Sequence, residues 1–292
     1  MNLIVESPVP RIEFADVRYI YHSGVVALAG ISLAIPPGQS VAIVGENGAG
    51  KTTLAKHLNG LLRPTAGQVW IGSRDTQVDC SPAELAHDVG YVFQRPEDQI
   101  FCRTVREEVA FGPRNLAFPT HEIGARVADA LAASGLDGLA DVHPYDLHAA
   151  QRKWVAIAGV LAMATPVVVL DEPSAGQDAV GVARLVALCR ALTAAGRTVI
   201  VITHDIEFAA DVVERVVVLR AGAVVVDGPA GEVLASPELE ETAGIAPPQL
   251  LQLGRALGLR RGEGEQTMAM AMTVGEFVVD YCLARVPRVT VQ

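Results

Sequence analysis

Short apolar runs separated by turn residues dominate the first hundred positions of the chain. The segments RIEFADVRYIY (11–21) and ALAGISLAIP (27–36) predict short strands, and the continuous apolar run SVAIV (40–44) predicts a buried one. From Thr52 to Leu62 the spacing of Leu54, Leu58 and Leu61 predicts a helix with one apolar side. Further strands are expected in GQVWIG (67–72) and VGYVFQ (89–94).

The pattern changes between about residues 95 and 160, where prolines punctuate amphipathic helical segments such as 104–112 and 121–135. Strands and helices then alternate again, with strands expected at 167–172 and 198–205, a helix between them, and a hairpin-like pair at 215–228. This alternation predicts an α/β fold with a parallel-sheet core. An N-terminal antiparallel β-subdomain, a helical insertion and a small C-terminal extension would complete it.

Composition narrows the class of protein. The 292 residues carry a net charge of −10, and 50% of them are hydrophobic although only 5% are aromatic. Such a chain is too apolar to be disordered, and its acidic balance argues against a nucleic-acid partner. The mean hydropathy of +0.32 raises the question of a membrane span, but the longest apolar stretch, Trp154 to Leu170, is interrupted by Pro166.

The four cysteines Cys80, Cys102, Cys189 and Cys282 lie far apart and form no CxxC pair. This spacing predicts neither a disulfide framework nor a zinc site. No export signal is visible at the N-terminus, so a cytoplasmic location is expected.

The segment GENGAGKT (45–52) has the spacing of a phosphate-binding loop and stands between an expected strand and an expected helix. Glycines let successive backbone N–H groups point at phosphate oxygens, Lys51 can reach the β- and γ-phosphates, and the Thr52 hydroxyl can ligate Mg²⁺. A chance glycine-rich turn is the alternative. The candidate ATP-binding residues here are Asn47, Gly48, Ala49, Gly50, Lys51, Thr52 and Thr53.

The segment VVVLDE (167–172) has the form of the companion strand in such ATPases. Asp171 is a candidate Mg²⁺ ligand, and Glu172 is a candidate base for the water that attacks ATP. A buried strand ending in two solvated acids would look the same, but the phosphate-binding loop makes that alternative the weaker one.

Taken in order, these motifs and several others resemble the ATP-binding cassette (ABC) ATPases, members of the P-loop NTPase class with a RecA-like core. Gln94 resembles the family's Q-loop glutamine, which contributes to the metal and catalytic site, and His204 resembles its switch histidine. The segment SAGQD, from Ser174 to Asp178, resembles the D-loop, and Tyr21 stands where the family places an aromatic that stacks on adenine. Each match alone has an ordinary explanation, whereas their shared order identifies the family.

Two further segments resemble one subfamily of the ABC ATPases. QRPEDQIF (94–101) and TVREEVAFGPRNL (104–116) look like the ATPases of energy-coupling factor transporters, which import vitamins and cobalt or nickel ions. The resemblance implies a cassette at 1–236, with its helical subdomain at about 95–160, and a dimerising extension at 237–292.

It also implies partners: a second ABC ATPase subunit, a transmembrane coupling protein and a membrane component that captures the substrate. The chain would then lie peripherally on the inner face of the cell membrane. Ile100, Phe101, Val109 and Phe111 could line a groove for the coupling protein, although a helical core would explain them equally well.

The chain departs from the family at its signature motif. Where the family has LSGGQ, this chain has Leu147, then His148, Ala149, Ala150 and Gln151, and Trp154 stands where an arginine is usual. In the family, the serine and glycines of one subunit donate hydrogen bonds to the γ-phosphate bound by the other. A bulky histidine and two added Cβ atoms would weaken that contact.

Two explanations compete. In one, the chain is half of an asymmetric heterodimer, in which a partner's intact signature completes its ATP site. In the other, His148 replaces the lost donor and a homodimer works normally; an engineered signature is a third explanation. Other functions left open are an ATPase of another importer branch, a mainly regulatory ATP-binding subunit and a soluble ABC protein outside transport.

Overall fold

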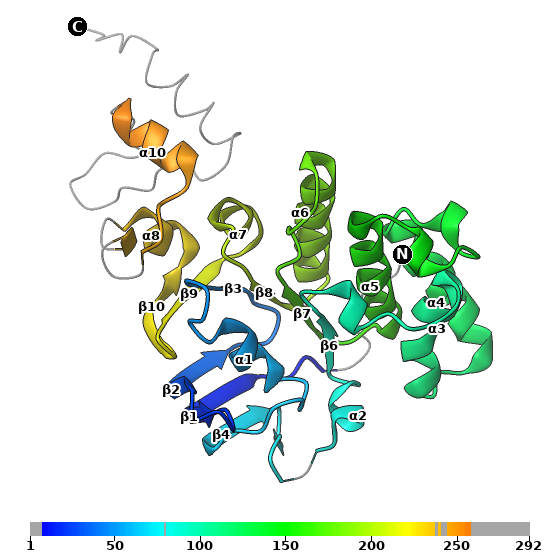
Figure 1. Cartoon of the computed structure of the whole chain (residues 1–292), viewed down its shortest axis with the longest axis horizontal. Helices are drawn as coiled ribbons and strands as arrows, with labels where there is room; N and C mark the ends of the chain where they lie inside the picture. Colours follow the sequence, from blue (N-terminus) through cyan, green and yellow to red (C-terminus); the bar gives the residue numbers. More distant parts are fainter. Residues whose placement is uncertain (1–7, 79, 237–238, 241–243, 258–292) are drawn as a thin grey trace, which may run out of the picture.

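The computed structural model describes residues 8–78, 80–236, 239–240 and 244–257, and its elements form two sheets with helices packed around the larger one (Figure 1). The strands are β1 (Ile12–Ile20), β2 (Val26–Ile35), β3 (Ser40–Val44), β4 (Ala66–Ile71), β5 (Arg74–Asp75), β6 (Val89–Val92), β7 (Val167–Asp171), β8 (Thr198–Ile202), β9 (Arg215–Arg220) and β10 (Ala223–Pro229). The helices are α1 (Lys51–Lys56), α2 (Pro82–Leu85), α3 (Val105–Asn115), α4 (Thr120–Ala133), α5 (Ala149–Met163), α6 (Ala179–Ala194), α7 (Ile206–Val212), α8 (Ala230–Ala235) and α10 (Gln249–Ala256).

The larger sheet has the strand order β10-β9-β3-β8-β7-β6, with parallel pairing from β9 to β6 and an antiparallel edge strand, β10. Its central strands are buried on both faces, as their continuous apolar runs require. Successive side chains enter different cores: Val41 and Ile43 face one cluster, and Ala42 and Val44 face the other. The predicted α/β fold with a parallel core is confirmed.

The smaller sheet is antiparallel, with the order β2-β1-β4-β5. It shares one core with α1 and one face of the larger sheet, through residues such as Phe14, Leu33, Leu54 and Ile200. The other face of the larger sheet packs against the helices from α3 to α7. The two cores together hold the carboxyl ends of β3, β7 and β8 at one edge, where the candidate site residues lie.

Three expected elements end earlier than predicted. The strand expected at 198–205 ends at Ile202, so His204 lies in the loop after it. The helix expected over Thr52–Leu62 stops at Lys56, where the backbone bonds tighten: the His57 amide donates to Leu54 and the Leu58 amide to Ala55, each three residues back. Gly60 then adopts a left-handed φ of 70°, and Leu61 is 51% exposed. Strand β6 ends at Val92, so Gln94 follows the strand instead of ending it; the Phe93 amide donates to the Gln99 side chain (3.1 Å).

Helices α3, α4 and α5 pack together within the predicted helical segment, on one side of Figure 1. Most of the extension expected at 237–292 lies outside the described residues, although helix α10 belongs to it. Among the residues that the structure describes, no helix is both long enough and apolar enough to cross a membrane.

Candidate active site

The glycine-rich loop connects buried strand β3 to helix α1, as the sequence predicts. Gly45 has a φ of 151°, and a Cβ atom there would lie 2.3 Å from the Leu219 carbonyl oxygen. Gly50 has a φ of 102° and would meet the Ala27 carbonyl oxygen at 2.5 Å. Neither position accepts a side chain, so the loop lies tightly against β9 and β2 with its backbone exposed to the site.

Lys51 is held within this loop. Its Nζ donates to the carbonyl oxygens of Gly45 (2.7 Å) and Glu46 (3.1 Å), and the residue is 7% exposed. Burial lowers the pKa of Lys51, while the nearby carboxylates of Glu172 and Asp171 oppose that shift. The ammonium is therefore held against the loop backbone beside the cavity, where it can bind an anionic ligand.

A cavity of about 370 Å³ opens beside this loop. It is lined by Tyr21, Val25, Val26, Ala27, Asn47, Gly48, Gly50, Lys51, Thr52, Thr53, Gln94 and Glu172. Residues from four distant parts of the sequence thus meet around one space. Ala49 does not line it, because its side chain is buried in the core beneath the loop.

Tyr21 forms one wall of this cavity. Its ring packs edge-on against Tyr19, with 4.9 Å between ring centroids, and its hydroxyl lies 2.9 Å from the Thr53 hydroxyl. Tyr21 is 39% exposed, so part of the residue remains accessible at the cavity wall. An aromatic face held this way can stack on a planar ligand.

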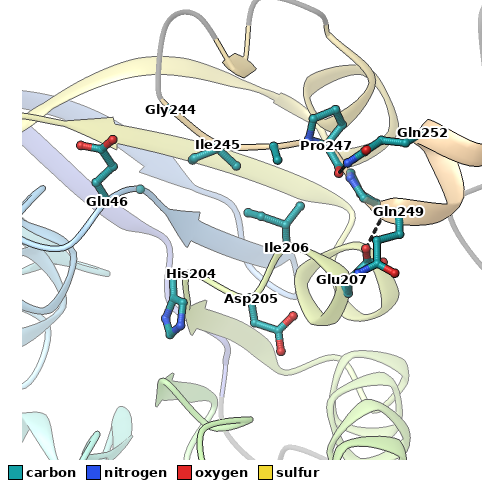
Figure 2. A pocket seen from close by; sticks show the side chains of 13 residues that line it. Glu46, His204, Asp205, Ile206, Glu207, Gly244, Ile245, Pro247, Gln249 and Gln252 are labelled. Atoms are coloured by element: carbon teal, nitrogen blue, oxygen red, sulfur yellow. Dashed lines mark hydrogen bonds between the residues drawn. The ribbon is translucent and has the colours of Figure 1, made fainter.

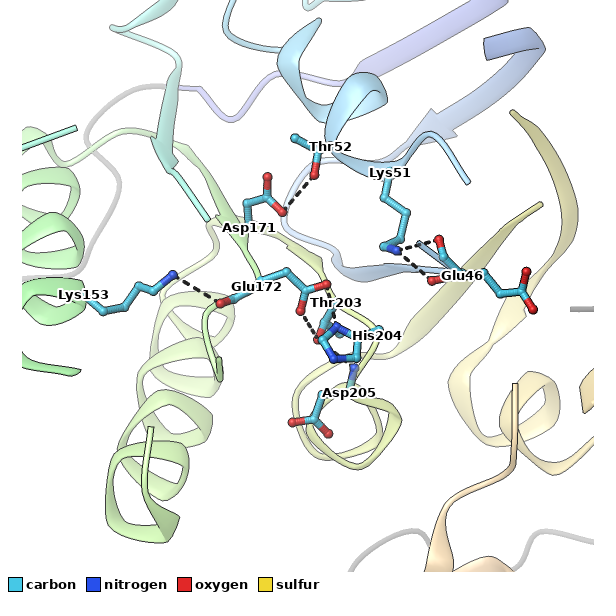
Figure 3. A network of polar contacts seen from close by, with 10 residues as sticks. Glu46, Lys51, Thr52, Lys153, Asp171, Glu172, Thr203, His204 and Asp205 are labelled. Carbon is cyan, nitrogen blue, oxygen red and sulfur yellow. Dashed lines mark hydrogen bonds and ion pairs between the residues drawn. The ribbon is translucent and has the colours of Figure 1, made fainter. Parts of the chain in front are cut away.

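Asp171 lies at the end of β7 and is 1% exposed (Figure 3). Its carboxylate accepts hydrogen bonds from Thr52 Oγ1 (3.3 Å) and from Tyr91 Oη (2.9 Å). Burial raises the pKa of Asp171, and these two hydrogen bonds oppose the shift. A buried carboxylate beside a hydroxyl is an oxygen donor set of the kind that Mg²⁺ prefers.

Glu172 follows immediately and has a φ of 46°, a left-handed conformation that is costly for a residue with a side chain. Its side chain is 7% exposed, with Oε1 2.9 Å from His204 Nδ1 and Oε2 accepting from Thr203 Oγ1 at 3.2 Å. The carboxylate is therefore fixed in orientation by two groups from the loop after β8 (Figure 3). A carboxylate oriented in this way can accept a proton from a neighbouring water.

His204 is far more exposed than the carboxylate it contacts, with 65% of its side chain accessible. It lines a second cavity of about 460 Å³, together with Glu46, Ile206, Glu207 and the C-terminal segment Gly244–Gln249 (Figure 2). The Gln249 amide donates to Glu207 at 2.5 Å and joins that segment to α7. His204 thus lines the second cavity and contacts Glu172, which lines the first.

The other residues predicted from the sequence lie outside the first cavity. His148 caps helix α5, its Nδ1 accepting from the Gln151 amide at 3.3 Å, and Ala149 and Ala150 form the first turn. Asp178 caps α6 by accepting from the Gly181 amide at 2.7 Å, and Ser174 is 9% exposed. None of these residues lines the cavity beside Lys51.

Several residues that touch the site were missed by sequence reasoning. Tyr91 and Thr203 hold the two carboxylates, and Lys153 donates to the backbone carbonyls of Gln94 and Glu172. A tyrosine inside a short buried strand and a lysine inside an apolar helix are the signals that could have indicated them.

Trp154, in place of the usual arginine, packs into a contact between α5 and the D-loop. Its Nε1 donates to Gln177 Oε1 (3.1 Å), Gln177 Nε2 donates to the Ala150 carbonyl (3.2 Å), and Arg184 lies 4.2 Å above the Trp154 ring. The altered signature is therefore an ordered helix start, tied to the segment between Ser174 and Asp178.

The sequence of this chain is similar to known families of proteins. The sequence profile described as ABC transporter matches residues 28–175. The energy-coupling factor transporter ATP-binding protein EcfA of Methanocaldococcus jannaschii is 41% identical over 243 residues, which cover 83% of this chain and 87% of that protein. The cobalt import ATP-binding protein CbiO of Rhodobacter capsulatus is 42% identical over 261 residues, or 88% of this chain and 92% of its own length.

Solved structures of ATP-binding cassettes are similar to this chain. The structure of cbiO1 from Clostridium perfringens, part of the ABC transporter complex cbiONQ, superposes with a TM-score of 0.70 at 35% identity and covers 85% of this chain and 98% of its own. A dimeric ATP-binding cassette in a post-hydrolysis state, bound to ADP and Pi, gives a TM-score of 0.70 at 29% identity over 75% of this chain. The predicted P-loop NTPase fold is confirmed, and the chain belongs to the ABC transporter family of ATPases.

Proposed function

We propose that the cavity beside Lys51 binds ATP and that Glu172 initiates its hydrolysis. The observation that carries this proposal is the oriented carboxylate of Glu172 at the edge of a cavity lined by the glycine-rich loop. Tyr21 would stack on adenine, while Asn47, Gly48, Gly50, Thr53 and Lys51 would bind the phosphates. Ala49 contributes its backbone only, since its side chain points into the core.

In the reaction, Glu172 would take the proton of the attacking water while Lys51 binds the phosphate charge. His204 and Thr203 would keep the Glu172 carboxylate aimed at that water. Thr52, Asp171 and Gln94 would hold Mg²⁺, which supplies charge neutralisation at the phosphate oxygens. Their hydroxyl, carboxylate and amide oxygens fit that ion.

The second part of the proposal concerns assembly. We propose that the chain works in a dimer and that this dimer is asymmetric, because the signature carries His148, Ala149 and Ala150 in place of serine and two glycines. Ser174, Asp178 and Gln151 would lie at the contact with the partner cassette. The related cassette that was solved as a dimer with ADP and Pi supports the dimeric assembly.

The third part concerns transport. The names of the relatives, an energy-coupling factor transporter protein and a cobalt import protein, support an importer of that type. The exposed pair Phe101 and Phe111, 63% and 43% accessible and packed edge-to-face at 4.6 Å, offers an apolar surface within the segment that follows Gln94 in the sequence. Ile100 and Val109 are buried, so they belong to the helical core.

A transmembrane coupling protein would cover the Phe101–Phe111 pair, and a membrane component would capture the vitamin or metal ion. The chain would then act as a cytoplasmic, peripheral subunit on the inner face of the membrane, without nucleic acid. Residues 1–236 would form the cassette, with about 95–160 as its helical part and 237–292 as a dimerisation extension.

Glu172→Gln tests the catalytic assignment. It keeps the size of the side chain but removes the basic carboxylate. In the dimer with a partner cassette whose signature is intact, ATP affinity is therefore expected to stay within about threefold while hydrolysis falls about 100-fold or more. Glu232→Gln, at an exposed position of α8, is the matched control. Undiminished hydrolysis by Glu172→Gln would remove Glu172 from the mechanism.

Phe101→Asp tests the transport assignment. Co-purification with a coupling membrane protein expressed beside the chain is expected to be lost, while ATP binding persists. Val78→Asp, which also places a charge at an exposed apolar position, is the control. Equal recovery of the membrane protein with both variants would contradict the assigned surface.

A second candidate function is a mainly regulatory ATP-binding subunit. The altered signature is the observation that favours it. Hydrolysis measured with and without a partner cassette separates the two functions, because a regulatory subunit would bind ATP without turning it over in either case.

A further inference from the structure

Lys153 is a cation in the interior of the protein. It lies on α5, whose other buried residues are apolar, and it is only 3% exposed. A lysine seldom occurs at such a position unless its ammonium is hydrogen-bonded and its charge is balanced. Methionine would fill a similar volume without the cost of burying a charge, so packing alone does not account for this residue.

The ammonium of Lys153 joins three segments that are distant in the sequence. Its Nζ donates to the carbonyl oxygen of Gln94, in the loop after β6, and to the carbonyl oxygen of Glu172 at 3.3 Å (Figure 3). Both acceptors are main-chain atoms, so the bonds fix backbone and leave the Gln94 and Glu172 side chains free to act. A single group on α5 is therefore bonded to the backbone of two candidate site residues.

Electrostatics allow this arrangement. Burial lowers the pKa of Lys153, and the carboxylates of Asp171, Glu172 and Glu97 oppose the shift. The ammonium thus lies near Asp171 and Glu172. Because it donates to neutral main-chain carbonyls, it holds the backbone without forming an ion pair with either carboxylate.

The backbone of Glu172 needs such an anchor. Its φ of 46° is a strained conformation, and strain of this kind persists only where the surroundings hold it. The Glu172 amide donates to the Ile202 carbonyl at 2.8 Å, and Lys153 binds its carbonyl, so the peptide units on both sides are held.

We infer that Lys153 is a positioning residue for hydrolysis: it fixes the main chain of Gln94 and Glu172 to helix α5 and so sets the direction of the Glu172 carboxylate. This role rests on the proposed hydrolytic function of Glu172. Lys153 itself would touch neither ATP nor the attacking water. Movement of α5 would shift both loops together, because one ammonium holds them.

Lys153→Met is the direct test. It keeps the aliphatic length and removes the donor, so ATP affinity is expected to stay within about threefold while kcat falls about 10- to 100-fold, as for other small misplacements of catalytic groups. Lys153→Arg, which keeps donors at the end of the chain, is expected to recover part of kcat. Arg190→Met is the control, since Arg190 also donates to a backbone carbonyl, that of Asp211, but on the outside of α6.

A second measurement separates failure of this inference from failure of the proposed function. Hydrogen exchange of the nucleotide-free protein is expected to speed up in peptides containing Gln94 and Glu172 when Lys153 is methionine, and to stay unchanged in the control. This readout does not depend on ATP hydrolysis, so it remains decisive even if the wild-type protein proves inactive.

Unchanged exchange in both peptides, with kcat within twofold of wild type, would overturn the inference. A fall in thermal stability without a change in kcat would also overturn it, because that result describes a purely structural lysine. If Lys153→Met does not fold, Lys153→Gln takes its place: its side chain ends one atom short of the lysine Nζ and carries no charge, so the bonds to both carbonyls are weakened and kcat is again expected to fall, with faster exchange in the two peptides.

Discussion

Restoring a serine and two glycines at the signature would change stability and activity in opposite directions. The variant His148→Ser/Ala149→Gly/Ala150→Gly keeps a helix cap, because serine accepts from the first-turn amides about as well as the present His148 Nδ1, at 3.3 Å from the Gln151 amide. The two glycines sit in the first turn of α5, where each costs about 0.5–1 kcal/mol relative to alanine. Unfolding should therefore become easier by about 1–2 kcal/mol, equivalent to a fall in Tm of about 2–8 °C.

Hydrolysis should change the other way. A lost donor to the transition state costs about 3 kcal/mol, or about 100-fold in rate, so restored donors should raise ATP turnover of the isolated chain about 10- to 100-fold. The assay is steady-state phosphate release beside a thermal melt of the same preparation. Ala183→Gly/Ala187→Gly, at two exposed positions of α6, supplies a comparable helix destabilisation without touching the signature. Turnover no greater than that of this control, in a folded variant, would refute the reasoning.

Three further predictions concern single side chains. Tyr21→Ala removes the ring and its contact with Thr53, so calorimetry should show ATP binding weakened by about 1–3 kcal/mol, whereas Tyr21→Phe should bind nearly normally. Tyr91→Phe leaves the buried Asp171 carboxylate without one donor, and urea unfolding should show a loss of about 1–3 kcal/mol. Burial and neighbouring acidic side chains raise the pKa of Cys102 to about 11, so little of the thiol is ionised below that pH. The rate of Cys102 alkylation, followed by mass spectrometry, should therefore keep rising up to about pH 11, whereas an ordinary cysteine would level off near pH 9.

The parts of the fold that follow from local pattern were predictable. The apolar runs at 40–44, 167–171 and 198–202 could only be strands buried on two faces, and the structure places them side by side. The helix over Thr52–Leu62 was overestimated, because leucine spacing continues past Lys56 while the backbone turns into a tighter, three-residue bonding pattern at His57 and Leu58 and leaves helical geometry by Gly60. The spacing of apolar residues alone does not show where the backbone leaves the helix.

Some residues of the candidate site could likewise be predicted from the sequence, and others could not. Residues that follow the carboxyl ends of parallel strands, Lys51, Glu172 and His204 among them, could be expected to lie near one another. Lys51 and Glu172 line one cavity, and His204 lies 2.9 Å from the Glu172 carboxylate. Lys153 could not be placed by sequence, since its partners belong to loops after two other strands. Such contacts depend on the tertiary packing of α5 against the sheet.

The central claim is that this chain carries a complete hydrolytic site of its own and a deficient signature for its partner. The measurement that tests it most directly is the ATP turnover of the purified chain, first alone and then mixed with a partner cassette whose signature is intact. Alone, the chain should bind ATP and hydrolyse it slowly; the mixture should turn over ATP rapidly, and Glu172→Gln in this chain should abolish that gain. Rapid hydrolysis by the isolated chain, or a gain that survives Glu172→Gln, would contradict the claim.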